Sequence, residues 1–137
     1  MAPGRPIALA AALLALGAAG CGQSDDRDRV RGVAERFYAA LKAGDGAAAC
    51  EQLSADTRAT LESDERAACR EAIASLEIEP GALTAVEVYI TNAKVDVQGG
   101  ESAYLSLTAD GWRLSAAGCT PAQGDPARMP LDCELEA

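Results

Sequence analysis

Residues 30–45, VRGVAERFYAALKAGD, decide the fold of this chain because they predict its organising helix. The apolar positions recur at steps of three and four, the spacing that places side chains on one face of an α-helix. The stripe consists of Val30, Val33, Ala34, Phe37, Tyr38 and Leu41. It contains the only phenylalanine in a sequence with few aromatic residues. We therefore predict a helix whose apolar stripe another part of the fold must cover.

The C-terminal half predicts the elements that cover this helix. After Pro80 and Gly81 the apolar period changes to two, which is typical of strands with one buried face. The expected inward side chains of the first stretch are Val86, Val88, Ile90, Val95 and Val97. They switch from even to odd numbers, so a continuous strand needs a bulge or break. We expect it at Asn92 and Ala93.

Two further strands are predicted beyond the turn at residues 98–101, with a second turn at residues 109–111 between them. Their expected inward rows are Ala103, Leu105 and Leu107, followed by Trp112, Leu114 and Ala116. The sequence thus predicts an α+β fold in which three N-terminal helices pack on a curved antiparallel sheet of three or four strands.

The segment between the first helix and the strands predicts two more helices. Gly44 ends the first helix, and the carboxylate of Asp45 caps the next one, expected over residues 46–53. A brief helical turn over residues 54–61 follows, with its first serine as the cap. The third helix is expected over residues 63–76, with a cap from the serine or aspartate at its start.

The first 20 residues, MAPGRPIALAAALLALGAAG, show one positive charge, an apolar run and small residues, the pattern of a secretory signal. Residues 16–21, LGAAGC, resemble a bacterial lipobox, whose cysteine is acylated and becomes the mature N-terminus. We predict a lipid on Cys21, a polar tether over residues 21–29, and one domain over residues 30–137 held at the cell membrane outside the cytoplasm. The alternative is a cleaved, fully secreted protein with a spare thiol at this cysteine.

The cysteine count supports the same compartment. Five cysteines are an odd number for an exported chain, and a lipid on Cys21 leaves four that can pair. Pairing between neighbours predicts Cys50–Cys69 across the second and third helices, and Cys119–Cys133 around a loop that secures a last short strand. Four cysteines allow three connectivities, and two buried free thiols in the helices are a further alternative.

Composition excludes several classes of function. The net charge is −9, and such an acidic surface repels nucleic acids and anionic membranes, so attachment to a membrane must come from something other than electrostatics. The chain has no histidine, which removes histidine triads and histidine metal sites. We expect no metal and no cofactor. Asp96 is the carboxylate best suited to act as a base, but its place in the alternation turns it outward beside Lys94.

A first helix ending in FYAALKAGD, a cysteine-bearing helical pair, and strands closing with DGWRL are together similar to the nuclear transport factor 2-like superfamily. This superfamily includes SnoaL-like and ketosteroid-isomerase-like domains, and the resemblance extends to small bacterial lipoproteins with the endings GWRLSAAGC and DCELE. It covers roughly residues 29–136. The resemblance implies a cone in which a curved sheet wraps the first helix, with a pocket at the open end. Phe37, Tyr38 and Trp112 are the expected lining of that pocket.

The sequence is compatible with three functions, because a fold does not by itself determine a function. The first is a non-enzymatic lipoprotein that binds a small apolar ligand or a protein partner. The second is an isomerase or cyclase, which needs an acid or base and an oxyanion donor inside the cone. The third is a homodimeric assembly or sensor module that uses the outer sheet face at Tyr89, Tyr104 and Arg113. A solvated outer face is the alternative to such a contact.

Overall fold

The computed structural model describes residues 21–121 and 131–137, and the predicted signal peptide lies outside the described residues. The elements are α1 (Cys21–Ala43), α2 (Gly46–Cys50), α3 (Ala55–Glu65), α4 (Cys69–Ala72), the 3₁₀ turn η1 (Ile73–Ser75), β1 (Leu83–Tyr89), β2 (Asn92–Val97), β3 (Ser102–Thr108), β4 (Gly111–Pro121) and β5 (Leu131–Glu136). The α+β class is confirmed. The sheet has five strands, where three or four were predicted.

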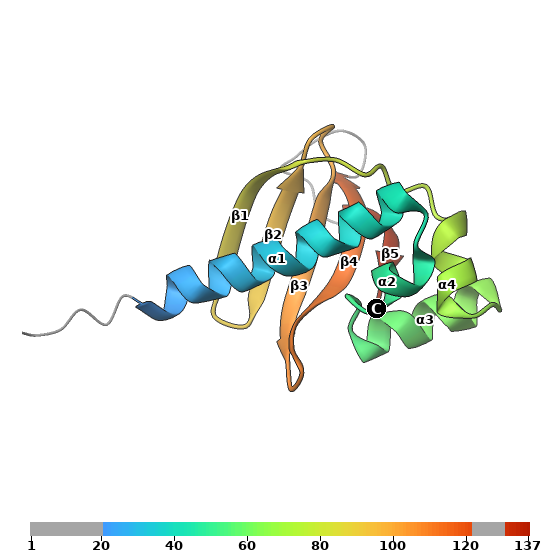
Figure 1. Cartoon of the computed structure of the whole chain (residues 1–137), viewed down its shortest axis with the longest axis horizontal. Coiled ribbons are helices and arrows are strands. Elements are labelled where there is room, and N and C mark those ends of the chain that lie inside the picture. The colour runs from blue at the N-terminus through green and yellow to red at the C-terminus, as the bar shows by residue number, and fades with distance from the viewer. Residues whose placement is uncertain (1–20, 122–130) are drawn as a thin grey trace, which may run out of the picture.

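The five strands form one antiparallel sheet in the order β1-β2-β3-β4-β5, so every strand pairs with its neighbours in sequence. Figure 1 shows α1 lying diagonally across one face of this sheet, with α2, α3 and α4 gathered at the end nearer β4 and β5. The helical segment is joined to the sheet through the backbone. Ser54 N donates to Leu114 O at 2.9 Å, and Leu114 N donates to Gln52 O at 2.9 Å.

The organising helix is confirmed. Val30, Ala34 and Phe37 are fully buried, Val33 and Tyr38 nearly so, and Leu41 is half-buried against the core. Gly44 adopts a left-handed φ of 69°, and the Asp45 carboxylate accepts from Ala48 N at 3.0 Å, as the capping pattern predicted. The helix starts at Cys21, so the segment expected as a polar tether is itself helical.

The boundaries of the other helices differ from the prediction. The Ser54 cap is confirmed, since its hydroxyl accepts from Thr57 N at 3.1 Å, but α3 continues beyond residue 61 to Glu65. Arg66 then ends it in a left-handed conformation, and α4 starts only at Cys69. A start at residue 63 or 64 was wrong because α4 is not capped from its own first residues. The Glu62 carboxylate accepts from Cys69 N at 3.0 Å and replaces a local cap.

Both predicted disulfides are present, Cys50–Cys69 and Cys119–Cys133. The first joins α2 to the start of α4, which pack so closely that a Cβ at Gly46 would collide with the Arg70 carbonyl oxygen. The second joins directly opposed residues of β4 and β5. This second bridge confirms the last short strand, which is β5. Two disulfides are typical of proteins in oxidising, extracytoplasmic compartments.

The bulge or break expected at Asn92 and Ala93 is a break, and it lies two residues earlier, at Ile90 and Thr91. The stretch is two antiparallel strands, in which Val86 pairs with Val95 and Tyr89 pairs with Asn92 around a turn at Ile90 and Thr91. From Ala85 to Tyr89 each residue pairs with one of opposite parity, so the inward row changes parity across the turn. The register irregularity of this hairpin lies elsewhere, between Leu83 and Ala85. Ile90, expected inward, occupies the turn with a φ of 33° and is 91% exposed.

The later inward rows are confirmed in part. Ala103, Leu105, Trp112 and Leu114 are buried, whereas Leu107 is 45% exposed at the end of β3. Further along β4, Ala117 is buried and Ala116 is only half-buried, because the β3–β4 register shifts between Ser102 and Leu105. Such an irregularity moves every later side chain to the opposite face. The core thus lies between α1 and the inner sheet face, closed at one end by α2, α3, α4 and η1.

Candidate functional site

The three residues expected to line a pocket are core residues. Phe37 is fully buried, and Tyr38 and Trp112 are 4% and 2% exposed. The Phe37 and Tyr38 rings pack edge to face with centroids 5.2 Å apart, and Trp112 Nε1 donates to Asp26 Oδ1 at 3.1 Å. Tyr38 borders one groove and Trp112 borders another. Within the described residues, the structure does not bring the three together around a shared pocket.

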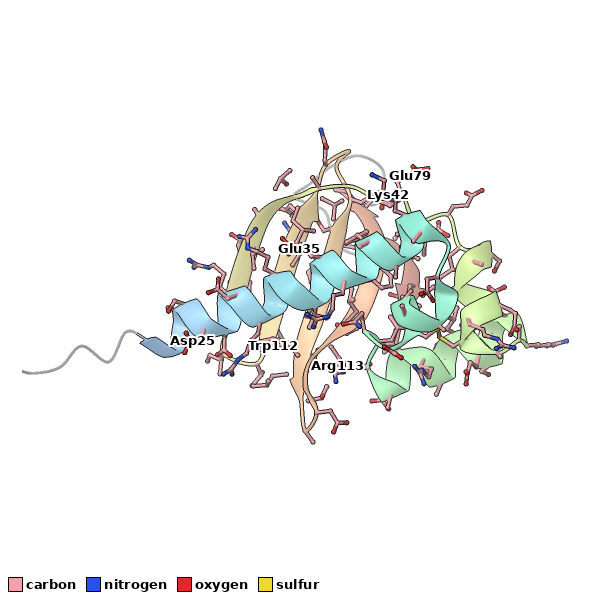
Figure 2. The ribbon with its side chains drawn as sticks, in the orientation of Figure 1. Asp25, Glu35, Lys42, Glu79, Trp112 and Arg113 are labelled. Atoms are coloured by element: carbon pink, nitrogen blue, oxygen red, sulfur yellow. A yellow bond between two sulfur atoms is a disulfide. The ribbon has the colours of Figure 1, made fainter. Side chains whose placement is uncertain are left out.

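The groove beside Tyr38 is the strongest candidate site among the described residues. It measures about 600 Å³ and lies between the C-terminal half of α1 and the segment that leads into β1. We call it the α1–β1 groove, and its lining consists of Glu35, Tyr38, Ala39, Lys42, Pro80, Gly81, Ala82, Leu83 and Gln98. Figure 2 shows Glu35, Lys42 and Glu79 on this side of α1. The volume is in the range of small-molecule sites, and the lining mixes apolar with charged side chains.

Two polar side-chain atoms are buried without a hydrogen-bond partner among the described residues, Tyr38 Oη and Glu101 Oε2, and of the two residues only Tyr38 lines the groove. Burial and the negative charge of Glu101 raise the pKa of Tyr38 well above its ordinary value, so its hydroxyl stays protonated. Burial also raises the pKa of Glu101, and the charges of Glu79 and Glu134 add to this, against a backbone hydrogen bond at Glu79 that lowers it.

A protonated hydroxyl next to a carboxyl group with a raised pKa is able to hold a carbonyl or hydroxyl of a ligand. Sequence reasoning identified Tyr38 as a pocket residue but missed Glu101. This glutamate follows the turn at Gly99 and Gly100, and nothing in the local sequence indicates that its charge acts on a residue of α1. Only the return of β3 along β2 places the carboxylate near the tyrosine.

The predicted outer-face residues do share one sheet face. Tyr89, Asn92, Ser106 and Arg113 are successive partners in one row across four strands, and Tyr104 lies in a neighbouring row. Tyr89 is 57% exposed, while Tyr104 and Arg113 are half-buried. The nearby charge of Glu87 raises the pKa of Tyr89.

Asp96 stands on the outer face, as the alternation predicted. Its Oδ1 accepts from Lys94 Nζ at 2.9 Å and from Ser102 Oγ at 2.8 Å. The hydrogen bond from Lys94 lowers the pKa of Asp96, and the same contact raises the pKa of Lys94. This carboxylate is therefore a paired surface group, unsuited to serve as a general base.

Over residues 21–121 and 131–137, no group of three or more acidic, cysteine or histidine side chains is arranged to hold a metal ion. None of the helices in this part of the chain is long and apolar enough to cross a membrane. Comparison with protein-family models, with curated proteins and with solved structures finds no match to this chain.

Proposed function

We propose that this chain is an extracytoplasmic lipoprotein, held at the membrane by acyl chains on Cys21, whose domain binds a small ligand in the α1–β1 groove without catalysing a reaction. The lipobox-like residues 16–21 and the two disulfides support the location. One helix against a five-stranded antiparallel sheet is compatible with a nuclear transport factor 2-like architecture, which remains part of the proposal.

The observation that carries this proposal is the groove above Tyr38, whose hydroxyl is buried without a partner among the described residues. A buried, unpartnered hydroxyl costs stability, and a ligand that accepts its hydrogen bond removes that cost. The walls at Ala39, Pro80 and Leu83 favour an apolar body, and Lys42 at the rim favours a polar end. The expected ligand is a small amphipathic molecule that carries a carbonyl or hydroxyl group.

The same two atoms give the isomerase alternative its only specific support. A neutral tyrosine beside a carboxyl group with a raised pKa is a known way to stabilise an oxyanion. However, Glu101 does not line the α1–β1 groove, and the carboxylate that does, Glu35, is an exposed side chain. The described lining therefore places no buried carboxylate beside the tyrosine hydroxyl, so we favour binding over catalysis.

Native mass spectrometry of the chain purified from its own host tests the ligand. We expect a bound small molecule that is lost in Ala39→Trp, which fills the groove, and retained in Ala59→Trp, a matched change at an exposed position of α3. A wild-type protein that carries nothing, or equal retention by both variants, would contradict the proposed site. Mass analysis of the N-terminal peptide tests the anchor, which an unmodified Cys21 would disprove.

A further inference from the structure

Three large apolar side chains are exposed to solvent at one end of the sheet. Tyr89, Ile90 and Leu107 are 57%, 91% and 45% exposed, and they are the large hydrophobic residues that stand out as exposed within the described part of the chain. Tyr89 and Ile90 are at the β1–β2 turn, and Leu107 is at the end of β3. Leu107 N donates to Thr91 O at 2.8 Å, so the two hairpins meet. We call these three residues the tip cluster.

The tip cluster lies at the end of the molecule where α1 begins. Leu107 pairs with Trp112 across β3 and β4, and the Trp112 indole donates to Asp26 of α1. Asp26 follows Cys21 by five residues, about 7.5 Å along a helix. In Figure 1, α1 begins at the left, the β1–β2 turn lies at the lower left toward that end, and the β3–β4 turn lies at the bottom, below the middle of α1. A lipid on Cys21 would thus enter the membrane close to these exposed side chains.

Arginines gather beside the same end. Arg29, Arg36 and Arg113 line a groove of about 290 Å³, and we call it the arginine groove. Its lining also includes Asp28, Gly32, Val33 and Trp112, so three positive side chains face one carboxylate. Figure 2 shows Trp112 and Arg113 on the side of α1 away from Glu35 and Lys42.

The donors of these arginines are only partly used by the described residues. Arg36 Nε donates to Gln52 at 3.2 Å, Arg113 Nη1 donates to the Trp112 carbonyl at 2.8 Å, and Arg29 lies 3.7 Å from Asp26. Each contact uses one nitrogen of a group with five N–H donors, so donors remain for an anion.

The charge distribution permits this end to approach an anionic surface. In residues 21–36 the four acidic side chains are balanced by four arginines, so the net negative charge of the domain comes from the rest of the chain. Because exposed charges are screened beyond about 8–10 Å, the surface nearest Cys21 determines whether a membrane repels the protein. The overall acidity predicted repulsion. Asp110 in the β3–β4 turn and Glu87 near Tyr89 add two negative charges at this end, against one positive charge from Arg113, so most of the acidic excess lies elsewhere.

We propose that the tip cluster inserts into the interfacial layer of the membrane, and that the arginine groove binds the phosphate of a lipid headgroup there. This inference rests on the proposed anchor at Cys21. Arginine matches phosphate with paired hydrogen bonds, and tyrosine and aliphatic side chains favour the boundary between headgroups and acyl chains. The domain would then sit on the membrane in a fixed orientation, with the α1–β1 groove turned toward the aqueous side.

Depth-dependent quenching in vesicles tests the orientation. The full chain would be expressed with its leader, purified in detergent and reconstituted into vesicles of equal parts phosphatidylcholine and phosphatidylglycerol. A polarity-sensitive fluorophore would be attached to Ile90→Cys or, as the matched control, to Ser63→Cys on α3, also an exposed residue. Lipids brominated in their acyl chains should quench the label at position 90 several-fold more than the label at position 63.

Two different failures are distinguishable in this experiment. Equal quenching at both positions, with the chain still bound to vesicles, would overturn the docking and leave the anchor intact. A chain that does not stay with the vesicles and carries an unmodified Cys21 would overturn both. Circular dichroism and the absence of reactive thiols at the four paired cysteines verify that each labelled variant is folded.

The headgroup contact has its own variant pair. Arg29→Gln with Arg113→Gln removes two charges from the arginine groove, whereas Arg70→Gln with Arg58→Gln removes two charges from the remote helices. Only the first pair should reduce quenching at position 90, by about half or more, and the loss should be larger with phosphatidylglycerol than with phosphatidylcholine alone. Unchanged quenching in the first pair, or an equal loss in both pairs, would overturn the phosphate site.

Discussion

The two faces of the sheet are formed by the same strands but differ in how deeply their side chains are buried. In β3, Ala103 and Leu105 are buried under α1, while Tyr104 and Ser106 between them are half-exposed on the other face. The space between the inner face and α1 is filled by side chains, among them Phe37, Tyr38 and Trp112. The two sites that we propose therefore lie at the margins of the sheet, in the α1–β1 groove and at the tip cluster, rather than inside it.

The outer face satisfies its polar groups locally. Lys94 and Ser102 both donate to the Asp96 carboxylate, and Ser115 Oγ donates to the Tyr104 carbonyl at 3.2 Å. Exposed pairs of this kind contribute little to stability, because both partners are also solvated in the unfolded chain. The stability of the domain should therefore depend on the inner face, and substitutions on the two faces measure how strict that division is.

The largest expected effect is on the inner face. Leu105→Ala removes a buried side chain and should lower the free energy of unfolding by about 2–5 kcal/mol. The neighbouring Ser106→Ala on the outer face should change it by less than about 0.5 kcal/mol. Urea denaturation with the disulfides intact measures both. Similar losses in the two variants would contradict the division between the faces.

The two disulfides lie in different parts of the molecule, one in the helical half and one at the edge of the sheet, so their removal compares the stability of these parts. Their partners are 19 and 14 residues apart, so in the loop-entropy model the loss of either bridge costs about 3 kcal/mol. We expect similar losses for Cys50→Ala with Cys69→Ala and for Cys119→Ala with Cys133→Ala, measured by thermal and urea unfolding. A much smaller loss for the second pair would mean that β4–β5 pairing also persists in the unfolded chain.

Tyr38, on α1, places a hydroxyl that has no partner among the described residues in the core that covers the inner face. Tyr38→Phe removes a hydroxyl that has no partner among the described residues and should raise the free energy of unfolding by about 1 kcal/mol. The matched change on the outer face, Tyr104→Phe, should leave it unchanged within about 0.5 kcal/mol. Urea denaturation of the ligand-free protein measures both, and a clear destabilisation by Tyr38→Phe would show that the hydroxyl is hydrogen-bonded.

The smallest expected effect concerns the pH dependence caused by Glu101. Its pKa is raised in the folded chain, so the native state binds this proton more tightly than the unfolded state. The contribution of protonated Glu101 to the free energy of unfolding is fully present below the ordinary carboxyl pKa of about 4.3. It is lost as the pH rises through the higher pKa that Glu101 has in the folded chain. Glu101→Gln should remove this decline, and unfolding curves of both proteins from acidic to neutral pH measure it. Parallel pH profiles would contradict the raised pKa.

Local patterns predicted the features that depend on neighbours in sequence. The spacing of the apolar stripe alone predicted the buried face of α1, and the Asp45 and Ser54 caps followed from side chains that bond backbone three residues away. Pairing between neighbouring cysteines was also correct, because the closed loops are short. For the candidate site, local patterns predicted that Tyr38 lines a pocket and that Asp96 faces outward.

Distant partners explain the predictions that were wrong. A change of parity is produced equally by a bulge and by a hairpin with a two-residue turn, and only strand pairing distinguishes them. The α4 cap comes from Glu62, and the burial of Ala117 follows from a register shift against β3. The local spacing of residues does not indicate any of these contacts.

The sequence by itself determined the α+β class, the helix at residues 30–43, the inward rows of most strands and both disulfides, because each follows from a short repeat or a short loop. Only the tertiary structure decided that Phe37, Tyr38 and Trp112 are core, that the charge of Glu101 acts on Tyr38, and that the β1–β2 turn lies toward the start of α1. These depend on how side chains from distant segments fill one volume, and packing of that kind is set by the whole fold.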